Sequence, residues 1–520
     1  MHLRIATMAV LLAGFQCFAG CNGSAGAADD QGSQETLWPT KSWQVSTPEE
    51  QGMDSASLAR LIENVGAYKQ DSLMIIRHGK IVAEAYYAPY VAGISHDLRS
   101  VTKSVVGTLT AIQLKNGSLD SVDHPVMDLL SDKQIQNVDD RKKAMTVQSL
   151  LDMTSGIEWV EKAYTPGETI IRMYESPDRT AFVLNQPMAG VPGANFNYNG
   201  GNTYLLSALI NKKSGQSALD FAKKELFEPL GIKSAKWGPV DAQGVTNGEA
   251  GLFLSAHDMA RIGYLYLHNG TWEGKQIIPS SWVDRTKAGS VTATLGFHYA
   301  NLWWSYPEKG AYMARGRHSQ LILVLPKLDV VAVMTGVLPG TEFYSASGLI
   351  DDISSAVKSD TSLPAADPIA KALLATAIRQ AATERPSAVG GTPELAKAVS
   401  GKTYQFNDNV LHVKSFTLNF LDSDSSWVVT TYTRKADRPT ERFTGLVGLD
   451  GLFRKSPPAP YGINAAKGRW VNEHTFAMER RILGHGETQT WALTFDGDKV
   501  TVNFENTDGF KAELHGELTD

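Results

Sequence analysis

Two pairs of strand-like segments, one near residue 75 and one near residue 325, constrain the fold of this chain more than any other feature. SLMIIR and KIVAEAYY flank a turn at His78-Gly79, and QLILVLP and DVVAVMTG are separated by Lys327-Leu328. Short apolar runs bounded by turn residues are typical of strands. Because helical patterns fill the sequence between the two pairs, we expect an antiparallel sheet covered by helices, an α+β arrangement in which the two ends of the segment meet.

Several helices are predicted by apolar residues at helical spacing behind a capping residue. Asp54 precedes the first such pattern, Thr146 precedes VQSLLDM, and Ser255 precedes MARIGYLYLHNG. Each of these residues has a side-chain oxygen suited to an N-cap. A loop rich in turn residues, from Pro192 to Asn202, leads into TYLLSALINKKSG. We expect these helices to cover the sheet and to form a helical subdomain.

The character of the sequence changes after about Ser359. Residues 361–400 contain one helical pattern between stretches rich in Pro and Gly, so they are interpreted as a linker with a helix. From residue 401 to 520, alternating runs such as SWVVTTYTR, TQTWALTF and KVTVNF dominate, with a hairpin turn at Asp496-Gly497. A period of two predicts strands with one buried face. This region is therefore predicted to be an all-β domain, either a small sandwich or a barrel.

The first residues have the pattern of an export signal. One charge, Arg4, precedes an apolar stretch, and the segment FAGC ending at Cys21 resembles a lipoprotein cleavage box. Residues 1–21 are predicted to be a signal peptide with this lipobox-like end, Cys21 to be the lipidation site, and residues 22–45 to be a flexible tether. Cleavage of a simple signal peptide is the alternative. We expect an exported protein, either periplasmic or anchored to a membrane as a lipoprotein.

Composition excludes several classes of partner and cofactor. The formal net charge of −6 gives no basic surface for nucleic acid. Both cysteines, Cys17 and Cys21, fall in the leader, so no disulfide and no cysteine-based zinc site is available to the folded part. The pair His257-Asp258 lacks the spacing of an HExxH site. No metal and no cofactor is predicted, the expected partner is a small molecule, and the sequence predicts no oligomeric state.

Ser100 and Lys103 form the candidate catalytic pair. They lie three residues apart at the start of an apolar helical pattern, so their side chains project from one face of the helix. A serine hydroxyl attacks a carbonyl well only when a neighbouring group takes its proton, and a lysine amine is one such group. The helix start also offers backbone N–H groups where an oxyanion would develop. A Ser-x-x-Lys spacing occurs by chance in a chain this long, so the surrounding sequence has to support it.

Six segments give that support. HDLRSVTKS, LLDMTSGIEW, PGANFNYNGGNTYLLS, LFEPLGI, SAHDMARIGYLYLHNGTWEGKQIIP and GRHSQLILVLP follow one another between Ser46 and Gly336. Together they resemble the serine β-lactamase, DD-peptidase and esterase superfamily, and within it the class C-like branch that includes the 6-aminohexanoate-dimer hydrolases. The resemblance implies a β-lactamase/DD-peptidase-like fold and acyl transfer through a serine.

The resemblance also implies roles for individual residues. Ser100 would be the acylated nucleophile and Lys103 its proton acceptor. Tyr198 would be the tyrosine of the second motif, which carries the proton between the nucleophile and the leaving group. The oxyanion hole would use the N–H of Ser100 and one from the strand near Gly316, with Arg317 as the first choice. Without the other motifs, Tyr198 would be interpreted as a buried aromatic residue.

Two motifs depart from the family pattern. Gly200 stands at the asparagine position of Tyr-x-Asn, and RGRHSQ, starting at Arg315, stands where the family has Lys-Thr-Gly or His-Gly-Gly-Gln. The lactamases use the missing groups to hold a β-lactam, so efficient β-lactam hydrolysis is not expected. An arginine at 315 or 317 would bind a carboxylate bidentately. The neighbouring pair Trp303-Trp304 fits either a pocket rim or a buried strand. The candidate substrate-binding residues are Asn199, Asn202, Arg315, His318, Glu158 and Trp159.

The sequence thus predicts an exported serine hydrolase that acts on an amide or ester through an acyl-enzyme on Ser100. If Lys103 is the base, its amine has to be neutral part of the time, so a depressed pKa and a rate that rises toward alkaline pH are expected. Two alternatives stand beside this prediction. One is DD-peptidase, penicillin-binding or β-lactamase activity, and the other is a non-catalytic cell-envelope binding protein on a degenerate hydrolase fold.

Overall fold

A computed structural model describes residues 36–238, 240–294, 296–340, 342–420, 425–432, 441–458 and 462–519. The predicted signal peptide, the lipidation site Cys21 and the tether up to residue 35 lie outside the described residues. The chain divides into two units, Met1–Thr36 and Leu37–Asp520. Every helix and strand of the described residues belongs to the second unit.

A nine-stranded sheet forms the centre of the N-terminal half. Its strands follow the order β1-β3-β2-β14-β13-β12-β11-β10-β9. The β2–β14 pair is antiparallel, with Ile75 opposite Ala332, so the two ends of this half meet in the middle of the sheet as the sequence predicts. The strands are β1 (Gln44–Val45), β2 (Gln70–Arg77), β3 (Lys80–Tyr86), β9 (Val291–Thr294), β10 (Phe297–Ala300), β11 (Trp303–Tyr306), β12 (Ala311–Gly316), β13 (Gln320–Leu325) and β14 (Val330–Gly336).

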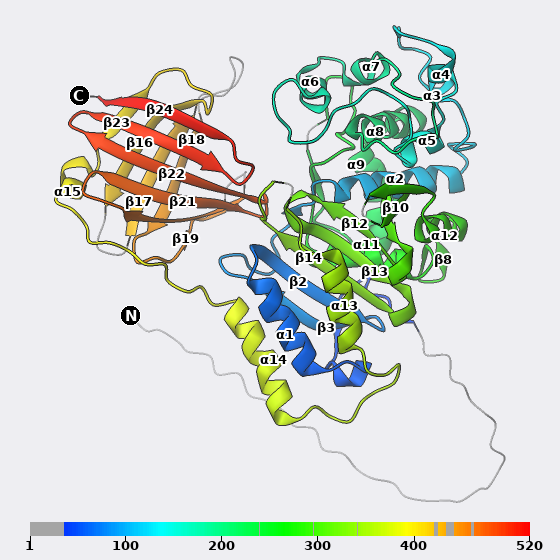
Figure 1. Cartoon of the computed structure of the whole chain (residues 1–520), viewed down its shortest axis with the longest axis horizontal. Coiled ribbons are helices and arrows are strands. Elements are labelled where there is room, and N and C mark those ends of the chain that lie inside the picture. The colour runs from blue at the N-terminus through cyan, green and yellow to red at the C-terminus, as the bar shows by residue number, and fades with distance from the viewer. Residues whose placement is uncertain are drawn as a thin grey trace, which may run out of the picture. The chain divides into compact units, whose positions relative to one another are not determined.

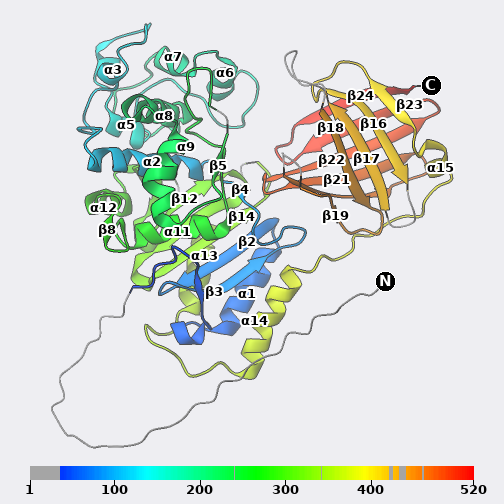
Figure 2. The same ribbon diagram turned by 180° about the vertical axis from the view of Figure 1, so that it is seen from behind.

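Helices cover both faces of this sheet. Alternate residues of β2 enter two different cores: Leu73 and Ile75 pack on one side, and Met74 and Ile76 pack on the other. Figure 1 shows the helices of the first side and Figure 2 those of the second. Burial on both faces explains why the middle of each central strand is a continuous apolar run and does not alternate with polar residues. The first side carries α1 (Ser55–Gly66), α13 (Ala346–Ala356) and α14 (Pro368–Ala381), and the second carries α2 (Val101–Lys115) and α11 (Ala256–Leu267).

A helical subdomain lies between β4 and β6. The predicted N-cap Thr146 is present, since its side chain accepts from the N–H of Ser149. The helix after the 192–202 loop begins at Gly200, earlier than predicted, and the Asn199 side chain caps it by accepting from the N–H of Asn202. Capping of this kind fixes where each helix begins. The remaining elements of this half are β4 (His96–Asp97), α3 (Val126–Leu129), α4 (Asp140–Lys143), α5 (Val147–Leu151), α6 (Thr169–Glu175), α7 (Arg179–Leu184), α8 (Gly200–Ser214), α9 (Ala218–Ala222), α10 (Glu228–Leu230), β5 (Lys236–Trp237), β6 (Leu252–Leu254), β7 (Thr271–Trp272), β8 (Lys275–Gln276) and α12 (Ser280–Ala288).

The prediction of a flexible tether as far as residue 45 is wrong for its last residues. Trp43 is buried, and its indole N–H donates to the carbonyl of His257. Trp38 packs against Tyr264 and Trp272, and β1 pairs with β3. Burying the apolar surface of two tryptophans stabilises this stretch by more than the conformational entropy that its few residues lose on ordering. The stretch is therefore held on the domain.

The C-terminal strands form a barrel, which decides between the two predicted architectures. Ten strands follow the order β18-β17-β16-β15-β24-β23-β22-β21-β20-β19, and a further β18–β20 pairing closes the sheet on itself. The predicted hairpin at Asp496-Gly497 joins β22 to β23, with Gly497 at φ 58°. The elements are α15 (Leu395–Val399), β15 (Thr403–Phe406), β16 (Val413–Phe420), β17 (Ser425–Tyr432), β18 (Glu441–Gly448), β19 (Arg454–Lys455), β20 (Ile463–Trp470), β21 (Thr475–Leu483), β22 (Glu487–Asp496), β23 (Lys499–Asn506) and β24 (Lys511–Leu518).

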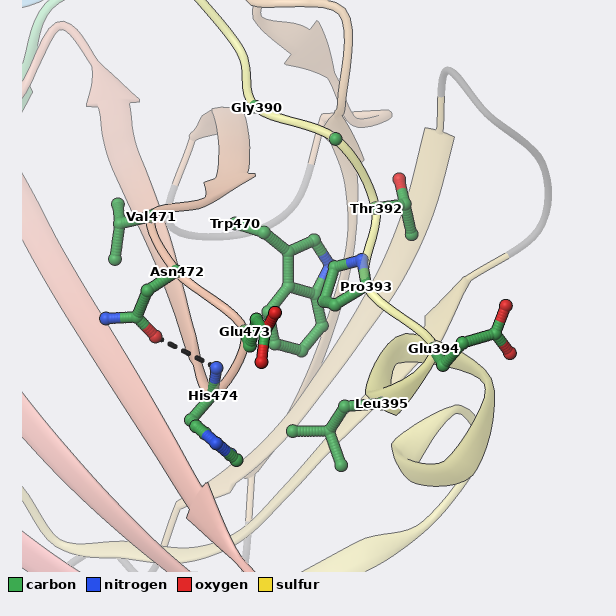
Figure 3. Close-up of a pocket in the computed structure, with 11 residues that line it drawn as sticks. Gly390, Thr392, Pro393, Glu394, Leu395, Trp470, Val471, Asn472, Glu473 and His474 are labelled. Atoms are coloured by element: carbon green, nitrogen blue, oxygen red, sulfur yellow. Dashed lines mark hydrogen bonds between the residues drawn. The ribbon is translucent and has the colours of Figure 1, made fainter.

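The barrel carries a surface pocket of about 570 Å³. It lies between the segment 390–395 and the β20–β21 turn, where Trp470 forms the floor and the N–H of His474 donates to the side chain of Asn472 (Figure 3). The described residues that line it include no serine, lysine or tyrosine.

Candidate active site

Ser100 and Lys103 meet at the start of α2. Ser100 is the residue before the helix, and Lys103 Nζ donates to Ser100 Oγ at 3.1 Å. The ammonium group is fully enclosed, because the Lys103 side chain is 1% exposed, whereas Ser100 is half-buried and lines a cavity. The structure thus places a hydroxyl at a cavity wall with a cation behind it.

Two buried carboxylates surround Lys103. Its Nζ lies 3.1 Å from Glu249 Oε2, 3.0 Å from the Glu249 carbonyl oxygen and 3.9 Å from Glu161 Oε1. Burial alone would lower the pKa of Lys103, but the charges of Tyr198, Glu249 and Glu161 oppose it and raise the pKa above its ordinary value. The prediction of a depressed Lys103 pKa is therefore wrong, because the fold brings two carboxylates from distant parts of the chain to the amine.

Glu161 is held by a dense set of donors. Trp159 Nε1 donates to it at 2.9 Å, Tyr164 Oη at 2.8 Å and the N–H of Gly200 at 2.6 Å. Glu249 lacks such support and depends on Lys103, and burial raises the pKa of its carboxyl, opposed by the Lys103 charge. Neither glutamate belongs to a recognisable motif, so reasoning from the sequence missed both.

The absence of a side chain at Gly200 makes room for these carboxylates. A Cβ at this position would lie 2.8 Å from Glu161 Oε2 and 3.3 Å from the Cβ of Glu249. Contacts that short force a neighbour to move. The side chains of Glu161 and Glu249 therefore occupy the space that an asparagine at position 200 would need. This explains why glycine stands at the asparagine position of Tyr-x-Asn.

Ser100 opens onto a cavity of about 420 Å³. Tyr198 lies on its wall, with its ring centroid 4.9 Å from Lys103 Nζ and stacked on Trp304 at 6.1 Å. Trp303 is fully buried on the opposite face of β11, so each of the two interpretations of this pair holds for one residue. The lining residues are Ser100, Glu161, Lys162, Tyr164, Tyr198, Thr294, Phe297, Trp304, Arg315, Gly316, Arg317 and Phe343.

Arg315 brings a positive charge to this mainly aromatic wall. Its guanidinium carbon lies 5.1 Å from the ring centre of Phe297, 5.8 Å from that of Trp304 and 4.6 Å from that of Phe343. Burial lowers the pKa of Arg315 from its ordinary value. Within the part of the chain that the structure describes, no carboxylate forms an ion pair with Arg315.

The other predicted site residues divide into two groups. Arg317 lines the cavity, and a Cβ on its neighbour Gly316 would lie 3.0 Å from the N–H nitrogen of Ser100, so this strand runs against the nucleophile. The prediction of substrate contact is not supported for five residues that lie outside the cavity lining. Asn199 and Asn202 are buried in the start of α8, His318 is buried beside the carbonyl of Leu338, Trp159 supports Glu161, and Glu158 is exposed to solvent.

Comparison with known proteins identifies the family. A family model described as Beta-lactamase matches residues 58–347, which is more than half of the chain. The chain belongs to the Beta-lactamase family. This membership confirms the resemblance seen in the sequence, and the sheet, helices and barrel confirm the predicted α+β class with an all-β C-terminal domain.

One hydrolase is similar in sequence to this Beta-lactamase family member, and solved structures of two penicillin-binding proteins resemble it. It is 24% identical over 316 residues to the 6-aminohexanoate-dimer hydrolase of Paenarthrobacter ureafaciens, an alignment covering 55% of this chain and 78% of that protein. It resembles the octameric penicillin-binding protein homologue from Pyrococcus abyssi with 18% identity and a TM-score of 0.47, covering 89% and 99% of the two chains. It also resembles a penicillin binding protein from Bacillus halodurans, with 15% identity, a TM-score of 0.45 and coverage of 57% and 98%.

None of the helices among the described residues is long and apolar enough to cross a membrane. The described residues also contain no group of three or more His, Cys, Asp or Glu side chains placed to hold a metal ion.

Proposed function

We propose that this protein is a serine hydrolase that cleaves an amide or ester through an acyl-enzyme on Ser100. The observation that carries the proposal is the contact between Lys103 Nζ and Ser100 Oγ, 3.1 Å long, at the wall of a cavity that Tyr198 also lines. Membership of the Beta-lactamase family supports it. The relative named 6-aminohexanoate-dimer hydrolase gives one amide to test, the dimer in its name.

The charges around Lys103 assign the proton steps differently from the sequence-based prediction. Lys103 is an ammonium at neutral pH because Glu249 and Glu161 hold its charge. An ammonium has no lone pair, so it stabilises an anion beside it instead of accepting a proton. We assign the acceptance of the Ser100 proton to the Tyr198 oxygen in its phenolate form, whose negative charge the Lys103 ammonium balances until the proton arrives and leaves a neutral phenol. The same tyrosine then returns the proton to the leaving group.

The oxyanion of the tetrahedral intermediate would be held by backbone N–H groups. The N–H of Ser100 lies at the start of α2, where the helix dipole favours negative charge. Gly316 runs past that N–H, which supports Arg317 as the second donor. Water then attacks the acyl carbon and releases Ser100.

Arg315 points to a substrate that carries an anionic group next to an apolar one. Its guanidinium offers a fork of donors to a carboxylate, and the cavity around it is aromatic. A carboxylate bound there would gain from the same burial that lowers the pKa of Arg315. We therefore place the anionic end of the substrate, on either its acyl or its leaving group, at Arg315 beside Phe343.

A fluorophosphonate probe tests the nucleophile. We expect stoichiometric labelling of Ser100 in the full chain, no labelling in Ser100→Ala, and labelling slowed by at least ~10-fold in Lys103→Ala and Tyr198→Phe, which each remove one group of the proton path. Hydrolysis of p-nitrophenyl butyrate should disappear with Ser100→Ala. Labelling that persists in Ser100→Ala would overturn the proposal.

Further assays on the same purified protein distinguish the alternative functions. Covalent capture of a fluorescent penicillin at Ser100 with slow release would favour a DD-peptidase or penicillin-binding protein, and fast turnover of nitrocefin would favour a β-lactamase. A protein that shows no labelling and no turnover would favour a binding protein on a degenerate hydrolase fold. The filled space at Gly200 supports the amide or ester hydrolase over the lactamase.

We further propose that the protein is exported and attached to a membrane through lipidated Cys21. The support is the FAGC segment at the end of an apolar leader. Expression with an alkyne fatty acid should label the wild-type chain and leave Cys21→Ala unlabelled. Recovery of both chains in the soluble fraction without label would contradict attachment.

A further inference from the structure

The C-terminal barrel touches both segments that frame Ser100. The turn between β21 and β22 is Gly484-His485-Gly486, and it lies on residues 95–99, directly before the nucleophile. The N–H of Asp97 donates to the Gly484 carbonyl at 2.6 Å, and Arg99 donates to the carbonyl of His485 at 2.7 Å. Because both acceptors are backbone carbonyls of the barrel, the backbone conformation of the turn determines where residues 95–99 are held.

Glycine is needed at this turn for space as well as for conformation. Gly484 and Gly486 have φ of 84° and 69°, a region that side chains rarely adopt. A Cβ on Gly484 would overlap the carbonyl oxygen of Ser95, and a Cβ on Gly486 would lie 3.2 Å from Cδ2 of His318. The turn therefore fits closely against both the segment before Ser100 and the loop after β12.

A second contact comes from the turn between β23 and β24. Asp508 Oδ1 accepts from Arg317 at 2.8 Å and lies 3.6 Å from Nε2 of His318. Arg317 in turn lies over the ring of Tyr164, with its guanidinium carbon 4.6 Å from the ring centre. Because Arg317 and Tyr164 both line the cavity, the barrel carboxylate sets one edge of the substrate site.

The backbone at these contacts is strained in a way that needs external support. Arg99, His318 and Ser319 have φ of 49°, 64° and 72°, although none is glycine. Such conformations cost about 1–3 kcal/mol each and persist where surrounding contacts fix them. Arg99 immediately precedes Ser100, and His318 and Ser319 follow the strand that runs past its N–H, so the barrel bonds act where the oxyanion hole is proposed.

We propose that the barrel completes the active site: the 484–486 turn positions the backbone on both sides of Ser100, and Asp508 positions Arg317 at the cavity edge. The inference rests on the proposed function for its catalytic consequence. The 484–486 turn and Asp508 have positioning roles, because neither touches the reacting atoms.

Variants of the full chain test the turn. Gly484→Ala forces the segment 95–99 to move, whereas Gly497→Ala, in the β22–β23 turn, has a similar positive φ of 58° and no atom within 4 Å of the added Cβ. We expect Gly484→Ala to slow fluorophosphonate labelling of Ser100 by ~10–100-fold, since a displacement of about 1 Å has that effect on catalysis. Gly497→Ala should label at the wild-type rate despite a comparable loss of stability.

Variants of Asp508 test the cavity edge. Asp508→Ala should raise the KM for p-nitrophenyl esters by ~5–10-fold, the expected result of losing one charged hydrogen bond to the Arg317 side chain. The kcat should stay within about twofold, because the proposed oxyanion donor is the main-chain N–H of Arg317, which Asp508 does not contact. Asp508→Asn, which keeps an acceptor, should recover most of the loss. Glu517→Ala removes an exposed barrel carboxylate and should leave both constants unchanged.

Hydrogen exchange separates failure of this inference from failure of the proposed function. Residues 95–101 and 316–320 should exchange faster in Gly484→Ala than in Gly497→Ala, whether or not the wild type turns over an ester. Equal exchange and equal labelling in the two variants would overturn the positioning role. An inactive, unlabelled wild type with the expected exchange difference would refute the hydrolase and leave the barrel contact standing.

Discussion

At the scale of single residues, Gly200 and the carboxylates beside it determine the charge of Lys103. Glu161 is fixed by three donors, and Glu249 lies 3.1 Å from the ammonium, so the site carries two anions around one buried cation. An excess of negative charge in a buried site keeps a lysine protonated. The charge state of Lys103, on which the proposed chemistry at Ser100 rests, therefore depends on residues that no serine–lysine spacing reveals.

Restoring the asparagine of Tyr-x-Asn should damage this site. Gly200→Asn places a Cβ 2.8 Å from Glu161 Oε2, so we expect a loss of about 1–3 kcal/mol in the free energy of unfolding and a marked drop in Ser100 labelling. Nitrocefin turnover should not appear. Gly190→Asn is the matched control, because a Cβ at Gly190 meets no atom within 4 Å. A Gly200→Asn protein as stable and active as the wild type would show that the carboxylates can move aside.

Removing one carboxylate should lower the pKa of Lys103. Glu249→Gln leaves Glu161 at 3.9 Å as the remaining acid, so the pKa of Lys103 falls, and breaking a buried ion pair costs about 3–5 kcal/mol. In the wild type, the ammonium form is favoured up to and beyond pH 10.5, so the labelling rate should show no lysine-dependent rise between pH 6 and 10. Glu249→Gln should label more slowly at pH 7 and gain a rise on the alkaline side. Superimposable pH profiles would contradict this role.

His318 should make the protein less stable in mild acid. Burial, with the nearby positive charge of Arg99, lowers the pKa of His318 to about 4, against 6.5 in an unfolded chain. Between these pH values the unfolded chain binds a proton that the native protein does not, so stability is present above pH 6.5 and falls toward pH 4. The loss should reach ~2 kcal/mol at pH 5. Denaturant unfolding at pH 7.5 and 5.0 measures it, and the difference should shrink by about that amount in His318→Asn, while the half-buried His78, His268 and His485 keep the remainder.

At the scale of elements, local patterns predicted most of the fold. The caps at Asp54, Thr146 and Ser255 are present, and the strand pair at His78-Gly79 forms as expected, because each depends on residues close in sequence. The contact of Ser100 with Lys103 is local in the same way. Glu249 is 146 residues from Lys103, so only the assembled fold brings them together. Closure of the barrel through β18 and β20 likewise depends on register, which period-two runs do not encode.

Strands β11 and β12 form one wall of the cavity at Ser100. Trp304 and Arg315 project into it from these neighbouring strands, and Trp303 faces the core. Arg315→Met keeps an apolar side chain of similar length and removes the charge. We expect kcat/KM to fall by ~10–100-fold for mono-p-nitrophenyl glutarate, an anionic ester, and to change less than ~3-fold for p-nitrophenyl butyrate. Arg315→Lys should recover part of the loss, because it restores charge without the fork. Equal losses of kcat/KM on both esters would contradict recognition of a substrate carboxylate by Arg315.

At the scale of the whole second unit, one buried ion cluster connects the barrel to the catalytic sheet. Arg481 on β21 donates to Asp71 on β2 at 2.6 Å, and the other oxygen of Asp71 lies 3.1 Å from Nε2 of His96 on β4. Burial would raise the pKa of Asp71, but Arg481 and His96 more than offset it and hold the pKa low. The carboxylate therefore stays ionised at neutral pH, and its stabilisation is lost only as the pH falls below the ordinary value of 3.8.

This cluster should make the barrel and the hydrolase half unfold together. Asp71→Asn leaves the guanidinium of Arg481 buried without its anion, which costs about 3–5 kcal/mol and weakens the connection more than either half. We expect calorimetry of the wild type to show one transition, and Asp71→Asn to show two, with the first at lower temperature. Asp71→Asn combined with Arg481→Met removes both charges and should recover part of the loss. Glu517→Gln, which breaks the exposed pair with Lys499, should leave the transition unchanged. A single transition at the wild-type temperature in Asp71→Asn would mean that the apolar and backbone contacts of the 484–486 turn suffice to couple the two halves.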